Sequence, residues 1–225
     1  MFYPDNLPRE EYLSFYAEHF NALELFYTYH VQPTSEEFFY LRRRSVGKIK
    51  FSLVANKELT NEVKVSKWRT IAKELRKSLY PLVNENLLLG LTFLFPPSFT
   101  YEEDNRRYLA NLLNEFTDIL DFIEFQHQGW FTKRVYEGLE RRKIGLCLCD
   151  KPSFSRFPSY VRTNTRNVIL SETGYIRLQN ELLNENQTGK VIHEITGRKN
   201  SVNVFFCQHT NGYAVLTAQK LKKAI

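Results

Sequence analysis

The chain has 225 residues, 43% of them hydrophobic, which is enough to bury a full core in a single domain over residues 1–225. Lys and Arg number 31 against 25 Asp and Glu, and the resulting net charge of +6 favours anionic partners, either a small molecule or nucleic acid. This composition excludes a disordered chain and a disulfide-rich secreted scaffold.

Several features predict a cytoplasmic protein without a membrane partner. No apolar stretch reaches the roughly 18 residues that a membrane helix needs, and no basic-then-apolar leader is recognisable. The three cysteines include a Cys147-Leu148-Cys149 pair that is too close in one strand for an ordinary disulfide, so we expect reduced thiols. Many basic residues fall where helices are expected to end, and cations there complement the helix dipole without any ligand.

Helix-like and strand-like segments alternate in the first half of the chain. Thr34 and Glu37 are spaced as a capping box that opens a helix ending at three arginines, and Pro81 is expected to end another helix. The remaining patterns predict a helix over 8–20, a strand over 22–27, a strand over 48–55 and a helix over 68–79.

The same alternation continues in the second half. Residues 88–95 are continuously apolar, which is typical of a parallel strand that is buried on both faces. Thr100 and Glu103 predict a second capping box. We further expect strands over 121–126, 144–149, 160–163 and 202–207, helices over 132–142 and 213–223, and a polar helical region over 174–187.

About seven strands, nearly all followed by helices, predict a parallel α/β fold, either a barrel or a doubly wound sheet. No Gly-x-Gly-x-x-Gly follows a strand, and no Gly-x-x-x-x-Gly-Lys is present, so neither a dinucleotide site nor a P-loop is expected.

The densest group of chemical side chains comes where the strand over 121–126 ends. It comprises Glu124, Gln126 and His127, with Trp130 shortly after. In a barrel, the carboxyl ends of parallel strands meet at one mouth, where active sites lie. Glu124, His127 and Asp150 are therefore the candidate catalytic residues, with His127 as a general base oriented by a carboxylate. The candidate ligand-binding residues are Glu24, Gln126, Trp130, Arg162 and Gln208.

Each candidate also has a structural interpretation. Glu124 could be a buried carboxylate paired with Arg162, because an unpaired buried charge is costly. His127 could bond backbone in a loop, and Trp130 could pack at a helix start. Three carboxylates and a histidine can bind a divalent metal, but the absence of further histidines at strand ends makes us predict no metal ligands.

Six different short motifs follow one another along nearly the whole chain: Phe2-Tyr3-Pro4, Phe51-Ser52, Phe95-Pro96-Pro97-Ser98-Phe99, Glu124-Phe125-Gln126-His127 with Trp130-Phe131, Tyr160-Val161-Arg162 and Phe205-Phe206. Together they resemble the YecE-like family, domain of unknown function 72. The resemblance implies an irregular barrel of the triosephosphate isomerase (TIM) type, with about seven visible strands. It carries no established reaction or cofactor; the family's barrel has been likened to endonuclease IV, an analogy of fold alone.

The chain departs from the family mainly at polar strand-end positions. The family usually opens with a strand carrying Gly-Thr-Ser-Gly-Trp, so the first barrel strand is expected to be missing or replaced here. The polar lining differs at Val54, Asn61, Leu94, Gln126, Asn164-Thr165, Cys207-Gln208 and Thr217. The resemblance thus implies a divergent member with altered or lost activity.

Two functions follow from these patterns, and whether the protein is an enzyme stays open between them. The first is a barrel that binds an anionic, phosphate-bearing or nucleic-acid ligand at the carboxyl-end mouth without catalysis. The alternative is a metal-assisted or acid/base hydrolase of a phosphate-bearing substrate, by analogy with endonuclease IV-like barrels.

Overall fold

The computed structural model describes residues 2–61, 63, 67–149, 173–178, 201–207 and 212–224. The chain forms two compact units: the N-terminal unit, Tyr3–Trp130, and the C-terminal unit, Phe131–Ile225 with Met1–Phe2. The single domain over residues 1–225 stays a prediction. Within each unit the described strands are parallel and pair in chain order, and the seven of them give the predicted α/β fold of the irregular TIM-barrel type.

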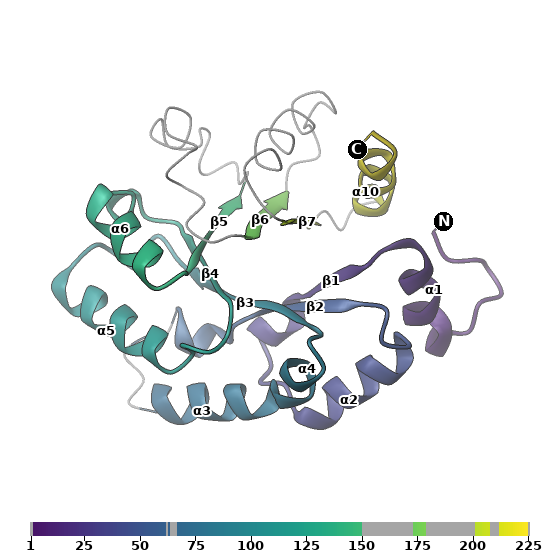
Figure 1. The fold of residues 1–225 in the computed structure, drawn as a ribbon, viewed down its shortest axis with the longest axis horizontal. Helices are drawn as coiled ribbons and strands as arrows, with labels where there is room; N and C mark the ends of the chain where they lie inside the picture. Colours follow the sequence, from purple (N-terminus) through teal and green to yellow (C-terminus); the bar gives the residue numbers. More distant parts are fainter. Residues whose placement is uncertain are drawn as a thin grey trace. The chain divides into compact units, whose positions relative to one another are not determined.

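The N-terminal unit alternates strands and helices as predicted (Figure 1). Its strands are β1 (Ala22–Leu25), β2 (Lys50–Val54), β3 (Leu88–Phe95) and β4 (Asp121–Phe125). Its α-helices are α1 (Tyr12–His19), α2 (Ser35–Arg44), α3 (Trp68–Ser78), α4 (Tyr80–Asn84) and α5 (Glu103–Asn114). Four short 3-10 helices lie in its loops: η1 (Arg9–Glu11), η2 (Phe26–Tyr29), η3 (Lys57–Leu59) and η4 (Gln128–Trp130).

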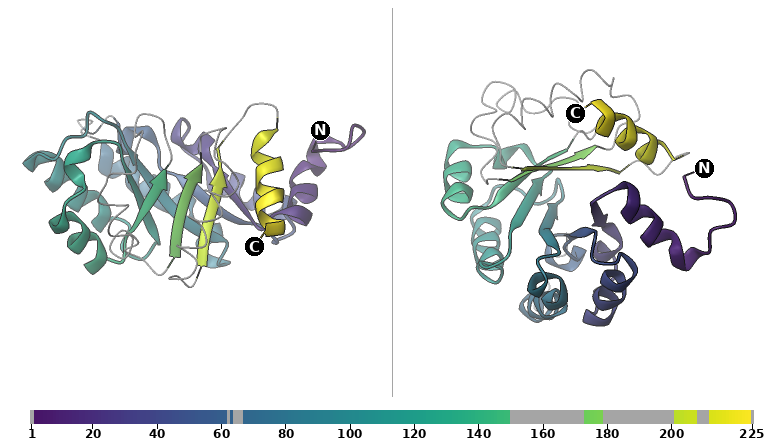
Figure 2. Two further views of the ribbon diagram at one scale, coloured as in Figure 1. Left: turned by 90° about the horizontal axis from the view of Figure 1, so that it is seen from above. Right: turned by 45° about the vertical axis from the view of Figure 1, so that its right-hand side comes forward.

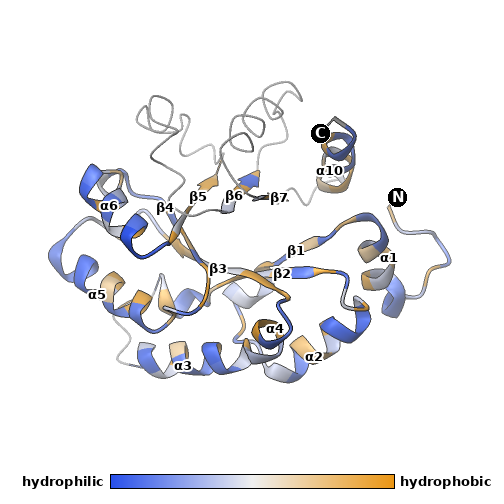
Figure 3. Ribbon diagram, viewed as in Figure 1, coloured by the Kyte–Doolittle hydropathy of each residue, from blue (hydrophilic) through white to orange (hydrophobic). Residues whose placement is uncertain are grey.

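The sheet of this unit has one face against the helices and one face turned away from them. Helices α2 to α5 lie along one side of β1–β4 (Figure 1), and we call that side the outer face. Because side chains alternate along a strand, the outer face takes the odd-numbered positions, which are apolar apart from Asp121: Leu23, Leu25, Phe51, Leu53, Leu91, Phe93, Phe95, Ile123 and Phe125. The Phe93 ring contacts Phe116, directly after α5, with ring centres 5.4 Å apart. The hydrophobic core of the unit therefore lies under the helices (Figure 3).

Helix boundaries follow the local signals except at one place. The Thr34–Glu37 capping box is present and opens α2 as predicted. Helix α3 ends at Ser78, before Pro81, as predicted. Pro81 itself lies in the first turn of the next helix, α4, where its missing N–H costs nothing.

The second capping box was predicted wrongly. Helix α5 begins at Glu103 with Glu102 as its N-cap and no side-chain cap, and the Thr100 hydroxyl donates to the Glu102 carboxylate instead, at 2.8 Å.

The C-terminal unit contains α6 (Lys133–Arg141), β5 (Gly145–Cys149), β6 (Thr173–Leu178), β7 (Ser201–Phe206) and α10 (Tyr213–Ala224). Strand β6 pairs with β5 on one side and β7 on the other, and α10 lies beside β7 (Figure 2). The helical region expected over 174–187 is wrong for its described part, because residues 173–178 form a strand. Hydrogen bonds to two flanking strands outweigh the local preference of so short a segment. The strand expected over 160–163 lies outside the described residues.

Candidate functional site

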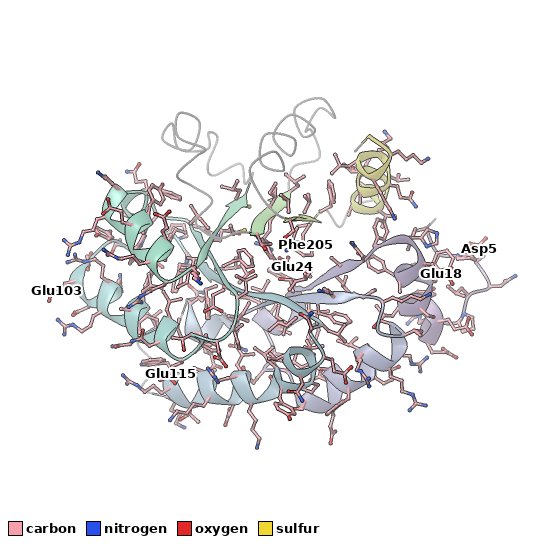
Figure 4. The ribbon with its side chains drawn as sticks, viewed as in Figure 1. Asp5, Glu18, Glu24, Glu103, Glu115 and Phe205 are labelled. Atoms are coloured by element: carbon pink, nitrogen blue, oxygen red, sulfur yellow. The ribbon has the colours of Figure 1, made fainter. Side chains whose placement is uncertain are left out.

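The face of the N-terminal sheet turned away from the helices, which we call the inner face, carries the polar side chains. Glu24 stands on it from β1, Ser52 from β2, Thr92 from β3 and Glu124 from β4, all at even positions. Figure 4 labels Glu24 on β1, on the side away from α2–α4. Pairing register places Glu24 level with Ser52, and Glu124 level with Leu94, so the two carboxylates share a face at different registers.

Glu124 is the best-defined group of the site. Its side chain is only 3% exposed, and its Oε1 atom accepts a hydrogen bond from Gln126 Nε2 at 3.2 Å. The Gln126 backbone N–H in turn donates to Phe95 O at 3.0 Å, which continues the β3–β4 pairing by one residue and fixes where the amide points. A buried carboxylate costs several kcal/mol unless it is hydrogen-bonded, and the Gln126 amide supplies such a bond.

His127 bonds the backbone of its own loop. Its Nδ1 atom accepts from the Gly129 N–H at 3.2 Å. A neutral ring whose Nδ1 accepts carries its proton on Nε2, so this bond leaves no ring nitrogen ready to take a proton. The contact agrees with the structural interpretation of His127, whereas the general-base role stays a prediction.

Trp130 packs among three other aromatic rings. The indole is 2% exposed and lies parallel to Phe99 and Phe125, with ring centres 5.1 Å and 4.6 Å away, while the Tyr101 ring is nearly perpendicular to it. Its Nε1–H donates to Phe99 O at 2.6 Å. Because the ring is buried and its N–H is bonded, Trp130 anchors the loop after β4 in this conformation and leaves no exposed face on which a ligand could stack.

The inner face near Glu124 is otherwise more apolar than a polar mouth requires. Val54 is fully buried and Leu94 is 6% exposed at the carboxyl ends of β2 and β3. Lower on the same face, the Phe122 ring fills the space over Gly90, where an added Cβ would lie 2.5 Å from the ring. Among the described residues the buried Thr92 hydroxyl has no hydrogen-bond partner.

A cation that the sequence analysis did not single out follows β2. Lys57, half-buried, opens η3, whose N-cap Asn56 accepts from the Glu58 N–H at 3.0 Å. The Tyr108 hydroxyl from α5 holds this loop by donating to Leu59 O at 2.8 Å, and burial raises the pKa of Tyr108. The sequence signal that could have identified Lys57 as a candidate was its position shortly after the apolar strand β2.

The other predicted residues, Asp150, Arg162 and Gln208, lie outside the described residues. In the C-terminal unit, Arg177 on β6 is 2% exposed, in register with Cys149 and Phe205. The sequence analysis did not single out Arg177, because it predicted a helix over 174–187.

Within the described ranges, no group of three or more His, Cys, Asp or Glu side chains is placed to hold a metal ion. None of the helices in those ranges is both long and apolar enough to cross a membrane.

Comparison with known proteins gives consistent matches. A family model described as "Protein of unknown function DUF72" matches residues 1–225, which confirms the resemblance drawn from the motifs. The UPF0759 protein YunF of Bacillus subtilis (strain 168) is 24% identical over 179 residues, which are 75% of this chain and 63% of YunF. The matched chain thus spans less than two thirds of that relative.

Solved structures show the same fold. A DUF72 family protein from Thermotoga maritima MSB8 aligns with a TM-score of 0.78 at 22% identity, over 99% of this chain and 92% of its own. A DUF72 family protein from Enterococcus faecalis V583 aligns with a TM-score of 0.80 at 15% identity, over 95% of this chain and 92% of its own. At these identities the likeness concerns the fold alone.

Proposed function

This chain belongs to the DUF72 family of proteins of unknown function, and we propose that it binds an anionic, phosphate-bearing ligand without catalysis, at the carboxyl ends of β2–β4. In barrels of this type, ligands bind where parallel strands end. Lys57 and Gln126 are the proposed contacts for the anion, and Glu124 is the proposed contact for a hydroxyl or amine of the ligand. Arg162 stays a predicted anion contact outside the described residues.

The observation that carries the absence of catalysis is the bonding of His127. Acid/base hydrolysis needs a group that takes a proton from water or substrate. With Nδ1 bonded to the Gly129 N–H, His127 would have to give up that bond first. Apolar Val54 and Leu94 beside Glu124 further reduce the polar contacts that a transition state would need.

Three features support an anionic ligand. The net charge of +6 attracts anions to the protein as a whole. Lys57 supplies a half-buried cation beside a strand end, where partial burial strengthens a charge–charge contact over one in open water. Gln126 presents a side-chain amide at the same edge, which can donate to a phosphate oxygen.

The test is a titration of the whole chain with inorganic phosphate, sugar phosphates and mononucleotides, followed by thermal shift and calorimetry. We expect at least one phosphate compound to bind. We expect Lys57→Gln and the double variant Glu124→Gln with His127→Ala each to weaken that binding by about tenfold or more. Lys73→Gln, an exposed lysine on α3, is the matched control and should bind as the native chain does.

Two results would contradict the proposal. If no phosphate compound binds, or if both site variants bind normally, the ligand site lies elsewhere. If the chain hydrolyses p-nitrophenyl phosphate or a phosphodiester, and the double variant alone loses that turnover, the hydrolase alternative replaces the non-catalytic one.

A further inference from the structure

A groove runs over the outside of the N-terminal unit, away from the strand ends discussed above. It has a volume of about 560 Å³ and lies where α2 and the turn after it meet the segment between α4 and β3. Helices α2 and α4 lie side by side (Figure 1). The lining residues are Phe39, Arg42, Arg43, Val46, Glu85 and Leu87, with Gly47 at one end.

Large apolar side chains are exposed in and around this groove. Phe39 is 51% exposed and Val46 is 68% exposed in the lining, and on α4 Tyr80 is 62% exposed and Val83 is 43% exposed. The apolar part of α4 is visible beside α2 in Figure 3. Exposed apolar side chains that gather in one place, with charged residues at their edge, are typical of a protein interaction site.

Val46 is held in an unfavourable backbone conformation at the edge of the groove. Its φ is +53°, in the left-handed region that a β-branched residue rarely adopts, and Gly47 follows at +66°. The turn is fixed by the Val46 N–H donating to Arg43 O and the Gly47 N–H donating to Arg42 O, at 3.3 and 3.2 Å. These two bonds are those of the common left-handed cap at a helix C-terminus. The same cap, with a non-glycine residue at positive φ, follows α4 at Asn86 and α6 at Lys143. At Val46 the cap leaves an apolar side chain exposed in the lining of the groove.

The groove and its edge carry more positively than negatively charged side chains. Arg42 forms an ion pair with Glu85 across the lining, so these two charges offset each other. Arg43 is exposed and adds a positive charge to the lining, and Lys48 follows the turn, also exposed. A groove that carries exposed apolar side chains together with excess positive charge complements a ligand that has an apolar side and acidic side chains.

We propose that this groove binds an amphipathic, acidic helical segment of a partner protein, with the apolar side of that segment on Phe39 and Val46 and its carboxylates toward Arg43. A helix in a groove uses apolar anchors at intervals of three to four residues. A second copy of this chain fits less well, because two surfaces of the same positive charge would repel each other. A flat bilayer fits less well, because it would desolvate the charged Arg42 and Glu85 without entering the hollow between them.

The probe is a synthetic, fluorescently labelled peptide of about 18 residues, with Leu and Phe on one side of the helix and Glu on the other. A control peptide replaces every Glu with Lys. Fluorescence anisotropy with the whole chain should show binding of the acidic peptide, and binding of the basic peptide at least about tenfold weaker.

Two variants locate the binding surface without disturbing the core. Arg43→Glu reverses the charge, and we expect it to weaken binding by about tenfold or more, whereas Arg141→Glu, an exposed arginine in the last turn of α6, should change binding less than about twofold. Val46→Asn removes the apolar side chain, but Asn tolerates the left-handed conformation. That variant should bind the acidic peptide about fivefold or more weakly while its melting temperature stays equal or rises.

Other outcomes overturn the proposal. Equal binding of both peptides, no binding of the acidic peptide, or binding that Arg43→Glu and Val46→Asn leave unchanged would each dismiss an acidic helix as the occupant. Co-sedimentation with phosphatidylserine vesicles that depends on Val46 and Arg43, without peptide binding, would assign the surface to a membrane. Dimerisation lost in the same variants would assign it to a second copy.

Discussion

Asp121, the first residue of β4, holds a buried carboxyl group on the outer face of the sheet. The side chain is 2% exposed, and among the described residues its Oδ1 atom has no hydrogen-bond partner. Burial and, to a lesser degree, the negative charge of Asp118 raise the pKa of Asp121 well above its usual value, while Arg76 lowers it. The Arg76 guanidinium is engaged by Asp118 at 2.6 Å and by Glu115 O at 2.6 Å.

The direction of this shift predicts how stability depends on pH. Because the folded pKa of Asp121 is raised, its contribution is fully present below the unfolded value near 3.8 and is lost as the pH rises through the folded pKa. Each pKa unit of difference corresponds to about 1.4 kcal/mol. Asp121→Asn removes the titration, so the variant should gain stability relative to the native chain as the pH rises.

The measurement is chemical unfolding over a series of pH values that rises from just above the usual aspartate pKa of 3.8. We expect the stability difference between Asp121→Asn and the native chain to move in favour of the variant as the pH rises. Asp5→Asn is the matched control, because Asp5 is exposed and does not contribute to the raised pKa of Asp121. A pH dependence that is equal in all three proteins would show that Asp121 ionises normally.

The positions of single residues at strand ends were predicted more successfully than their contacts. Glu124, Gln126 and His127 stand at a strand end as expected, since the apolar pair Phe122-Ile123 before them marks a short strand. Their partners depended on loop geometry. The Glu124 carboxylate meets Gln126, and His127 meets the Gly129 N–H two residues on, and neither contact follows from spacing alone.

At the scale of secondary structure, the two capping boxes give a direct comparison. In α2 the Thr34 hydroxyl accepts from the Glu37 N–H at 3.3 Å, and Glu37 Oε2 accepts from the Thr34 N–H at 2.6 Å. Before α5 the same spacing of Thr100 and Glu103 forms no box. There the Thr100 hydroxyl donates to the Glu102 carboxylate instead, and Asn105 of α5 donates to Thr100 O at 2.9 Å, so other bonds join this segment to the helix.

Thr34→Ala and Thr100→Ala should therefore differ in cost. Loss of an N-cap side chain destabilises by about 1 kcal/mol, so Thr34→Ala should lower the free energy of unfolding by about that amount. Thr100→Ala loses one exposed and one part-buried hydrogen bond of the Thr100 hydroxyl, neither of which caps α5, and we expect a loss of less than about 0.5 kcal/mol. Denaturant unfolding of both variants measures the difference. Equal losses would mean that the Thr34 box contributes little in solution.

The secondary-structure elements themselves were largely predictable where the pattern was long or strongly apolar. Strand β3 has the predicted bounds, and β4, β5 and β7 differ from prediction by a single residue at one or both ends. Strand β6 was missed because its six residues are short enough that pairing with β5 and β7, rather than local preference, decided its conformation.

At the scale of the whole molecule, the net charge of +6 predicts two kinds of anion binding that differ in their salt dependence. Association of an RNA oligomer with the general positive surface should fall by about tenfold or more between about 0.05 and 0.5 M salt, because screening acts on exposed charges. Binding of a small phosphate compound at partly buried Lys57 should fall by less than about threefold.

The check is a binding isotherm for each ligand across that salt range. The Lys57→Gln variant should bind the phosphate compound more weakly, whereas its salt-sensitive association with RNA should stay as in the native chain. If RNA binding instead resists salt and is lost with Lys57 or Glu124, then a nucleic acid is the specific ligand of the site.

The sequence by itself determined the order of strands and helices, apart from β6, and the side chains available at the strand ends, because both depend on patterns within a few residues along the chain. Only the tertiary structure decided that Trp130 packs parallel to Phe99 and Phe125, that Phe122 fills the space over Gly90, and that Val46 lines a groove with Phe39. Each of these depends on a neighbour from another segment, and packing between distant segments leaves no periodic trace in the sequence.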